Sequence, residues 1–206
     1  MLYRFLILFF SLVLRIAFRY EIVNRPKKSP GTPLLVCANH LSLIDIVSLA
    51  CAYPDRLYFV AKEELNHVFL FSAIFRHLGT IFVDRESNDI DAMRQMLSLL
   101  KEDKKLAIFP EGTRVKSIDP RNMKEGIGLL AQRAGVPIQC VQLDAHYHFR
   151  GSVRVIFKEL YVPEKLPLAQ RRAQRQEIVR EVFNRIYDRK EPLEAFQEEK
   201  HVHSNQ

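Results

Sequence analysis

The sequence predicts a single α/β domain with a mostly parallel central sheet flanked by helices. Between residues 20 and 189, short apolar segments typical of buried strands alternate with longer segments of helical periodicity. Polar or charged residues directly follow several of these strand segments, as expected where a ligand site lies beyond the carboxyl ends of parallel strands. A length of 206 residues fits one domain with a substantial core.

Residues 1–20 are the most apolar part of the chain and predict a helix. At about 100° per residue, Arg4, Ser11, Arg15 and Arg19 fall within one narrow stripe, and most of the remaining circumference is apolar. The uninterrupted apolar run is short for a bilayer core, which takes about 20 residues. We therefore expect a helix that lies in the membrane interface with its arginines toward lipid phosphates. The alternatives are a cleaved signal peptide and a helix packed wholly inside the protein.

Residues 34–38 predict a buried strand, and a turn and a helix follow it within a few residues. The expected helix begins near Leu43, with Ser42 as its N-cap. His40 then lies on the turn and Asp45 in the first helical turn. A carboxylate in that place can orient the imidazole so that its other nitrogen removes a proton from a hydroxyl. The alternative is structural, because Ser42 and Asp45 also fit a capping box, in which Asp45 only satisfies backbone amides.

The other elements follow in order along the chain. Strands are expected at residues 20–24, 57–61, 79–85, 106–109, 136–143 and 153–157. Helices are expected at residues 68–77, 89–101, 124–134 and 169–189. Lys62 and Arg85 stand at the ends of two of these strands, so they can share one rim of the sheet with His40.

The loop of residues 110–114 opens directly from the strand at 106–109. Gly112 allows a close backbone approach, Arg114 offers a planar fork to a phosphate, and the Thr113 hydroxyl adds a donor. The loop therefore predicts a phosphate-binding segment beside His40. A simple turn with a surface arginine is the alternative.

A net charge of +7 favours an anionic partner, which could be nucleic acid, an acidic membrane surface or a phosphorylated substrate. The chain shows no basic patch interleaved with aromatic residues, so we expect no nucleic-acid partner.

Cysteine and histidine spacing predicts no metal site. Three cysteines lie in apolar segments without metal-ligand spacing and are expected to be buried free thiols: Cys37, Cys51 and Cys140. A thiol nucleophile at Cys37 is the less favoured alternative. Four histidines come in pairs that could chelate a metal, without acidic or thiol partners at ligand spacing: His146, His148, His201 and His203.

Four blocks of sequence resemble, in order, those of the lysophosphatidic acid acyltransferases, a group within the glycerolipid acyltransferases. The blocks are Asn39-His40-x-Ser42-x-x-Asp45, then Lys62-x-Glu64-Leu65 with Gly79-x-Ile81-Phe82-Val83-Asp84-Arg85, then Phe109-Pro110-Glu111-Gly112-Thr113-Arg114, and finally Val136-Pro137-Ile138. The resemblance covers about residues 20–160 and implies the fold of that family. Each block is short, and the ordered set is what gives the resemblance its weight. Cys140 and Met123 depart from residues that the family often has near the fourth and third blocks.

The resemblance also implies roles for individual residues. His40 would be the general base and Asp45 its orienter. The acceptor phosphate would be held by Glu111, Gly112, Thr113, Arg114, Lys62, Arg85 and Lys124. Among these, Glu111 would hold the loop or a neighbouring base, because a carboxylate repels a phosphate. Neither a metal nor a cofactor is implied.

The implied reaction transfers a fatty acyl group from acyl-CoA or acyl-carrier protein to the sn-2 hydroxyl of 1-acyl-sn-glycerol-3-phosphate, giving phosphatidic acid. It would take place at the cytoplasmic face of the membrane, with the protein peripheral or monotopic. We expect a membrane-associated helix at residues 1–20, a catalytic domain at 21–190 and a polar, disordered tail at 191–206. The alternatives are the same chemistry on glycerol-3-phosphate or another lysolipid, and a non-catalytic protein that binds anionic lipid.

Overall fold

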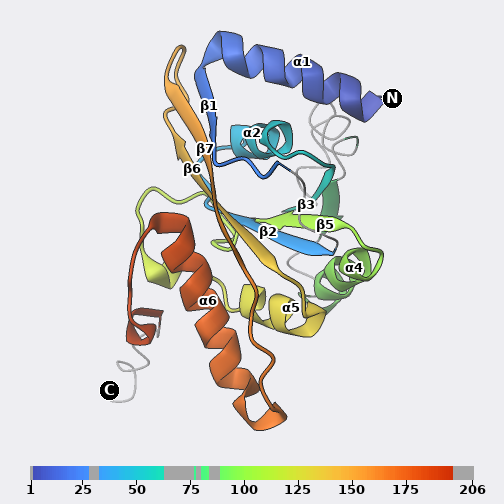
Figure 1. The fold of residues 1–206 in the computed structure, drawn as a ribbon, viewed down its shortest axis with the longest axis vertical. Helices are drawn as coiled ribbons and strands as arrows, with labels where there is room; N and C mark the ends of the chain where they lie inside the picture. The colour runs from blue at the N-terminus through green and yellow to red at the C-terminus, as the bar shows by residue number, and fades with distance from the viewer. Residues whose placement is uncertain (1, 28–32, 63–76, 78–79, 84–88, 197–206) are drawn as a thin grey trace, which may run out of the picture.

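In the computed structural model, the chain folds around one central sheet (Figure 1). The structure describes residues 2–27, 33–62, 77, 80–83 and 89–196. The described strands are β1 (Arg19–Val23), β2 (Leu34–Ala38), β3 (Leu57–Lys62), β4 (Thr80–Val83), β5 (Lys105–Ile108), β6 (Ile138–Ala145) and β7 (Ser152–Tyr161). They form one seven-stranded sheet in the order β1-β7-β6-β2-β5-β3-β4.

Every neighbouring pair in this sheet is parallel except β6 and β7. These two are antiparallel because a short turn joins them, whereas a parallel connection needs a long crossover. The prediction of an α/β domain with a mostly parallel sheet is therefore confirmed. β2 lies between β5 and β6, and all five of its residues are buried, as its continuous apolar sequence predicted.

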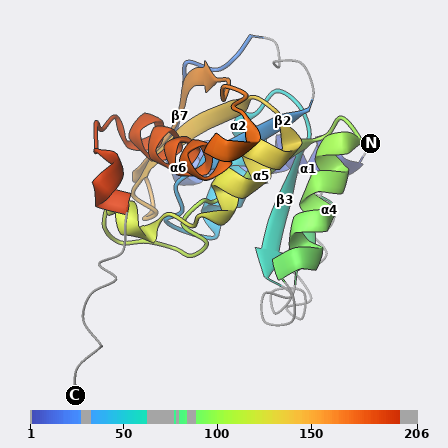
Figure 2. The same ribbon diagram turned by 90° about the horizontal axis from the view of Figure 1, so that it is seen from below.

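Helices cover both faces of the sheet, as the two views show (Figures 1 and 2). The helices are α1 (Leu2–Ala17), α2 (Ile44–Ala52), α4 (Asp89–Lys101), α5 (Gly126–Ala134) and α6 (Arg171–Tyr187). Leu34 and Val36 of β2 point into a core with α2, and α1 packs over α2. Leu35 and Cys37 point to the opposite face, into a core built with α4, α5 and α6. The alternation of side chains along β2 thus divides the interior into two layers.

Three predicted helix starts are wrong by one or two residues, including that of α6, which begins at Arg171 rather than at residue 169. The N-cap of α2 is Leu43, with no side-chain cap, although the Ser42 hydroxyl accepts a 3.3 Å hydrogen bond from the Ile44 amide. α5 begins at Gly126, with Glu125 as its N-cap, and the amide of Lys124 donates to the carbonyl oxygen of Pro110. The predicted helix at 68–77 lies outside the described residues except for its last position.

Part of the segment expected to be a disordered tail, residues 191–206, has regular structure. Residues Leu193–Phe196 form a short 3-10 helix, η4, and the Phe196 ring lies 5.3 Å from the Phe183 ring in an edge-to-face contact. This aromatic contact and the hydrogen bonds between the Asn184 side chain and the Glu191 backbone hold the segment on α6, which its polar composition did not reveal. Residues 197–206 lie outside the described part of the chain.

Candidate active site

His40 and Asp45 lie in contact at the carboxyl end of β2. The Nδ1 atom of His40 is 2.9 Å from the Oδ2 atom of Asp45. His40 stands on the turn after β2, and Asp45 is in the first turn of α2, where a carboxylate is favoured by the helix dipole. Asp45 is fully buried, whereas the His40 side chain keeps 13% of its surface exposed. The imidazole can therefore face a substrate while the aspartate is shielded from water.

Asp45 also organises the turn itself. Its Oδ2 atom accepts hydrogen bonds from the amides of Leu41, at 2.5 Å, and Ser42, at 2.7 Å. The capping-box alternative and the orienting role are thus compatible, since one carboxylate oxygen serves both. With Nδ1 donating to this oxygen, the Nε2 atom of His40 has a free lone pair and can accept a proton.

The other sides of His40 are held by the loop after β5. The imidazole stacks on the Phe109 ring, with centroids 4.1 Å apart and planes inclined by 15°. The backbone amide of His40 donates to Glu111 Oε2 at 2.8 Å, and its carbonyl oxygen accepts from the Val115 amide at 2.9 Å. The segment between Phe109 and Val115 is therefore bound to His40 through three contacts.

Glu111 is a buried carboxylate that links this loop to α6. It is 2% exposed, and its Oε1 atom accepts a hydrogen bond from the Tyr187 hydroxyl. Burial raises the pKa of Glu111, while the hydrogen bonds from Tyr187 and from the His40 amide act in the opposite direction. The pKa of Tyr187 is raised by burial and by the nearby carboxylate. Both carboxylate oxygens thus face protein donors, in keeping with a role in holding the loop.

Several of the predicted phosphate-binding residues lie on this loop. Gly112 has a φ of 69°, in the left-handed region that favours glycine, and its amide donates to the Phe109 carbonyl in a tight turn. Thr113 and Arg114 are exposed beside it, and Arg114 directly precedes the residue bound to the His40 carbonyl. The structure therefore brings these residues together with His40.

The structure gives less information on the other three basic residues that were predicted to bind the phosphate. Lys124 is exposed, and its amide is bound to Pro110 at the start of the same loop. Lys62 is the last residue of β3, at the same edge of the sheet as His40, and its side chain is not among those described. Arg85 lies outside the described residues.

Two tyrosines at the site were missed by the sequence reasoning. The hydroxyl of Tyr147 donates to Asp45 Oδ1 at 2.5 Å, and Tyr187 contacts Glu111. Tyr147 is 102 residues from Asp45, and no local spacing links the two. The Asn39 side chain pairs with both backbone groups of Leu143 and so joins the end of β2 to β6, the strand that leads to Tyr147, but this link is visible only in the structure.

The three cysteines are buried and free, as predicted. Burial raises the pKa of Cys140 to about 12 and holds the pKa of Cys37 well above its ordinary value. A thiol that stays protonated is a poor nucleophile, which argues against the alternative of catalysis by Cys37. Within the described ranges, no group of three or more His, Cys, Asp or Glu side chains is arranged to hold a metal ion.

Comparison with known proteins gives consistent results. Residues 19–144 match the protein family described as Acyltransferase. The chain is 27% identical over 142 residues to a 1-acyl-sn-glycerol-3-phosphate acyltransferase of Helicobacter pylori, in a match that covers 63% of this chain and 60% of that protein. It is 30% identical over 143 residues to the human 1-acyl-sn-glycerol-3-phosphate acyltransferase beta, covering 68% of this chain and 51% of the relative. The chain thus spans little more than half the length of these two relatives.

A solved structure shares the fold. The 1-acyl-sn-glycerophosphate acyltransferase PlsC of Thermotoga maritima superposes with a TM-score of 0.68 at 22% sequence identity, over 92% of this chain and 81% of that one. At this identity the likeness establishes the fold, and the chemistry has to be argued from the side chains described above.

Proposed function

Because the chain belongs to the acyltransferase family, we propose that it transfers a fatty acyl group from acyl-CoA or acyl-carrier protein to the sn-2 hydroxyl of 1-acyl-sn-glycerol-3-phosphate. The product would be phosphatidic acid. The observation that supports this most strongly is the contact between His40 and the buried Asp45, beside a glycine-containing loop that bears Arg114. The names of the relatives supply the acceptor class.

In the proposed mechanism, Nε2 of His40 removes the proton of the acceptor hydroxyl as that oxygen attacks the thioester carbonyl. Asp45 stabilises the imidazolium that forms. The tetrahedral intermediate then collapses with cleavage of the carbon–sulfur bond, and the imidazolium returns the proton to the departing thiolate. The products are the acylated acceptor and the free thiol carrier, and the reaction as written involves no metal or cofactor.

We assign the acceptor phosphate to the loop of residues 110–114. The Arg114 guanidinium can make two parallel hydrogen bonds to a phosphate, and the Thr113 hydroxyl can add a third. Lys62, Arg85 and Lys124 are proposed to assist. Glu111 is proposed to act through the loop, since its carboxylate binds the His40 amide and Tyr187.

We further propose that α1 is a membrane-associated helix, that residues 21–190 lie in the catalytic domain, and that the protein is peripheral or monotopic at the cytoplasmic face. The helix expected at residues 1–20 ends at Ala17, because Arg19 begins the strand β1. Seven large apolar side chains of α1 are exposed: Leu2, Phe5, Leu8, Phe9, Leu12, Val13 and Ile16. Among the residues that the structure describes, no helix is long and apolar enough to cross a bilayer. A helix that lies in the interface accounts for the exposed apolar side chains.

The experiment that tests this function is thiol release from acyl-CoA or acyl-carrier protein in the presence of 1-acyl-sn-glycerol-3-phosphate. We expect His40→Ala and Asp45→Asn to lower kcat by about 10²–10⁴-fold, the usual contribution of general base catalysis. His77→Ala, which removes an exposed imidazole, is the matched control and should keep full activity. Full activity in His40→Ala would overturn the mechanism.

Competition among acceptors separates the alternatives. If glycerol-3-phosphate or another lysolipid is the true acceptor, it will be acylated with a higher kcat/KM than 1-acyl-sn-glycerol-3-phosphate. A non-catalytic lipid-binding protein would release no thiol with any acceptor, and its salt-sensitive binding to anionic vesicles would survive His40→Ala.

A further inference from the structure

The turn between β6 and β7, residues 146–151, is bound to the end of α1. The amide of Arg150 donates to the carbonyl oxygen of Ala17 at 2.6 Å, and the amide of Arg19 donates to the carbonyl oxygen of Gly151 at 2.8 Å. A Cβ atom at Gly151 would overlap the backbone of this turn, so the close approach requires glycine. The turn and α1 therefore form one connected unit.

This unit exposes apolar surface beyond α1 itself. Phe149, in the middle of the turn, is 74% exposed, the highest value among the large apolar side chains that the structure describes. The exposed apolar residues of α1 range from 40% to 71%. Large apolar side chains that lie together on a surface indicate a contact site for a membrane or another protein.

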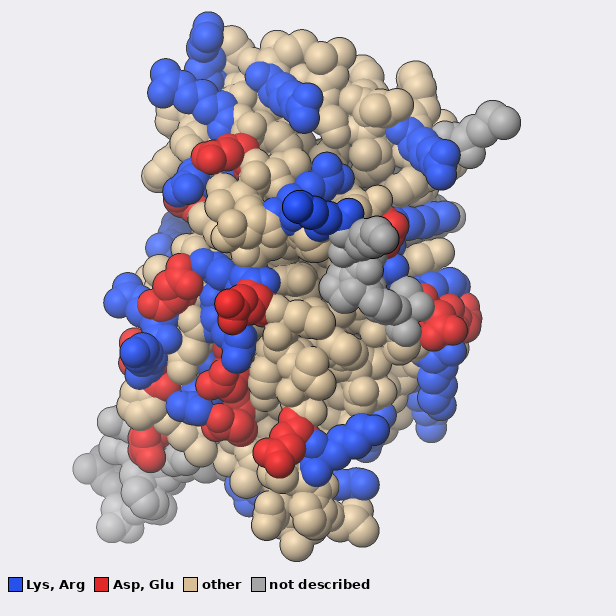
Figure 3. All heavy atoms as spheres, in the orientation of Figure 1, with Lys and Arg blue, Asp and Glu red and all other residues tan. Residues whose placement is uncertain are grey.

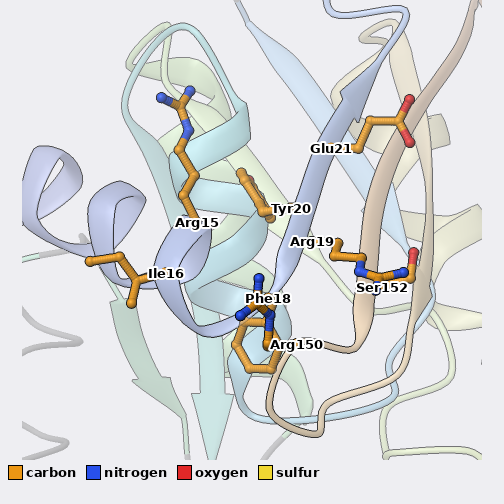
Figure 4. Close-up of a pocket in the computed structure, with 8 residues that line it drawn as sticks. All are labelled: Arg15, Ile16, Phe18, Arg19, Tyr20, Glu21, Arg150 and Ser152. Atoms are coloured by element: carbon orange, nitrogen blue, oxygen red, sulfur yellow. The ribbon is translucent and has the colours of Figure 1, made fainter.

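A basic pocket lies between the turn and α1. It has a volume of about 540 Å³ and is lined by Arg15, Arg19 and Arg150, together with Glu21 (Figure 4). Figure 4 shows that its residues come from α1, from β1 and the residue before it, and from the start of β7 and the turn before it. Glu21 is already paired with Arg154, 3.1 Å away.

Within the described ranges, the positive charge of this pocket is only partly neutralised, by Glu21. Among the described residues, none of the three arginines that line it forms an ion pair with a carboxylate. In Figure 3, the end of the molecule that holds α1 and the turn, at the top, shows mostly tan and blue atoms, and most of the red atoms lie below it. Guanidinium groups in such a pocket suit a phosphate, to which arginine can bind through two parallel hydrogen bonds.

We propose that α1 and the β6–β7 turn form one membrane-docking surface, in which Phe149 enters the apolar region of an anionic bilayer and Arg15, Arg19 and Arg150 bind a phospholipid phosphate. The pairing of exposed apolar side chains with adjacent unpaired arginines matches the layering of such a bilayer, where acyl chains lie beneath a plane of phosphates. The inference rests on the proposed interfacial role of α1. It does not depend on the proposed acyl transfer.

The test is co-sedimentation of the full chain with vesicles of phosphatidylcholine, with and without phosphatidylglycerol. We expect Phe149→Ser to weaken binding to both kinds of vesicle by about tenfold, because a largely exposed phenyl ring loses its apolar partner. We expect Arg150→Gln to weaken binding to the phosphatidylglycerol vesicles by about fivefold, as one basic residue near an anionic surface contributes, and to weaken binding to the phosphatidylcholine vesicles less, because their phosphates are balanced by choline. Arg150→Gln keeps the backbone bond to Ala17, and an unchanged melting temperature verifies the fold of each variant.

Matched controls lie at the opposite end of the molecule, where α6 begins (Figure 1). Leu168→Ser removes an apolar side chain that is 73% exposed, and Arg172→Gln removes an equivalent exposed charge. Both should bind vesicles like the unmodified chain. Unchanged binding of Phe149→Ser, or an unchanged preference of Arg150→Gln for phosphatidylglycerol, would overturn the proposal. Since sedimentation needs no turnover, the outcome is independent of whether thiol release is detected.

Discussion

At the scale of the residue, His40 contacts two buried carboxylates that have different roles. Asp45 contacts its ring through Nδ1, and Glu111 contacts its backbone amide. Each carboxylate in turn accepts a hydrogen bond from a tyrosine, Tyr147 and Tyr187 respectively. A side chain whose ring and backbone are both fixed loses little entropy when it meets a substrate, which is the benefit of a preorganised base.

The Tyr147→Phe substitution tests whether the hydrogen bond from Tyr147 to Oδ1 of Asp45 contributes to catalysis. It removes one donor from a buried carboxylate and leaves the ring in place, at a cost of about 1–3 kcal/mol in the free energy of unfolding. If the same energy orients Asp45 during catalysis, kcat will fall by roughly 5- to 150-fold. The KM for the acyl donor should not change. Urea unfolding and steady-state kinetics measure these quantities.

Tyr161→Phe is the matched control for this prediction. Tyr161 is half-buried on β7, where its ring lies 5.0 Å beneath the Arg185 guanidinium, away from His40. Loss of its hydroxyl should leave kcat unchanged. If both variants keep full kcat, the bond from Tyr147 has no part in catalysis.

Glu111 gives a prediction about stability and pH. Burial raises its pKa in the folded state above the ordinary value of 4.5, so between these two values the folded chain holds a proton that the unfolded chain has released. The contribution of Glu111 to the free energy of unfolding is therefore complete below pH 4.5 and is lost as the pH rises through the folded-state pKa. Glu111→Gln, which still accepts from the His40 amide, removes this dependence.

The measurement for Glu111 is urea unfolding of both proteins from pH 4.5 to 8. The stability of Glu111→Gln relative to the unmodified chain should rise with pH and then become constant. A difference that stays flat, or that falls with pH, would show that burial does not raise the pKa of this carboxyl.

At the scale of the element, the close packing of α5 and α6 brings Tyr187 to Glu111. A Cβ atom at Gly128 would overlap the carbonyl oxygen of Arg175 and lie 3.0 Å from its carbonyl carbon. These are backbone atoms, so they cannot move aside without shifting the helix. Gly126, two residues earlier in the same helix, has nothing within 4 Å of such an atom.

The pair Gly128→Ala and Gly126→Ala separates packing from helix propensity. We expect Gly128→Ala to lower the free energy of unfolding by about 1–3 kcal/mol or more, the usual cost of overpacking. Gly126→Ala should be neutral or stabilising by up to about 1 kcal/mol, because alanine is the better helix former. Thermal and urea unfolding of both variants provide the comparison. Equal effects of the two substitutions would contradict the close approach of α5 and α6.

At the scale of the whole molecule, one turn joins α1 to the candidate active site. Residues 146–151 are bound to Ala17 at the end of α1, and Tyr147 of the same turn donates to Asp45. The Phe18 ring also meets the Tyr147 ring edge to face, with centroids 5.7 Å apart. The helix proposed to lie in the membrane interface and the proposed base are thus on the same edge of the sheet.

This arrangement predicts that α1 is needed for full activity on an acceptor embedded in a bilayer. The double variant Leu8→Gln/Leu12→Gln removes two exposed apolar side chains of α1 and should lower activity on vesicle-bound 1-acyl-sn-glycerol-3-phosphate by about tenfold or more. Activity on a short-chain acceptor dispersed in water should stay the same. Ile90→Gln, on the exposed face of α4, is the control. An equal loss on both acceptors would instead indicate damage to the fold.

The sequence by itself determined the alternation of strands and helices, the mostly parallel sheet and the grouping of His40 with Asp45. Hydrophobic periodicity acts over a few residues, and His40 and Asp45 are separated by one turn, so local information was sufficient. Local sequence information was also sufficient to identify, in order, the four blocks that resemble the family.

Only the tertiary structure decided which distant side chains complete the site. Tyr147 reaches Asp45 because β6 pairs with β2, and Tyr187 reaches Glu111 because α6 packs beneath the same strands. The arginines of the basic pocket line one site because β1 pairs with β7 beside the β6–β7 turn. Strand order and helix packing arise from the burial of whole faces over the entire chain, and such long-range contacts leave no spacing that a local pattern could reveal.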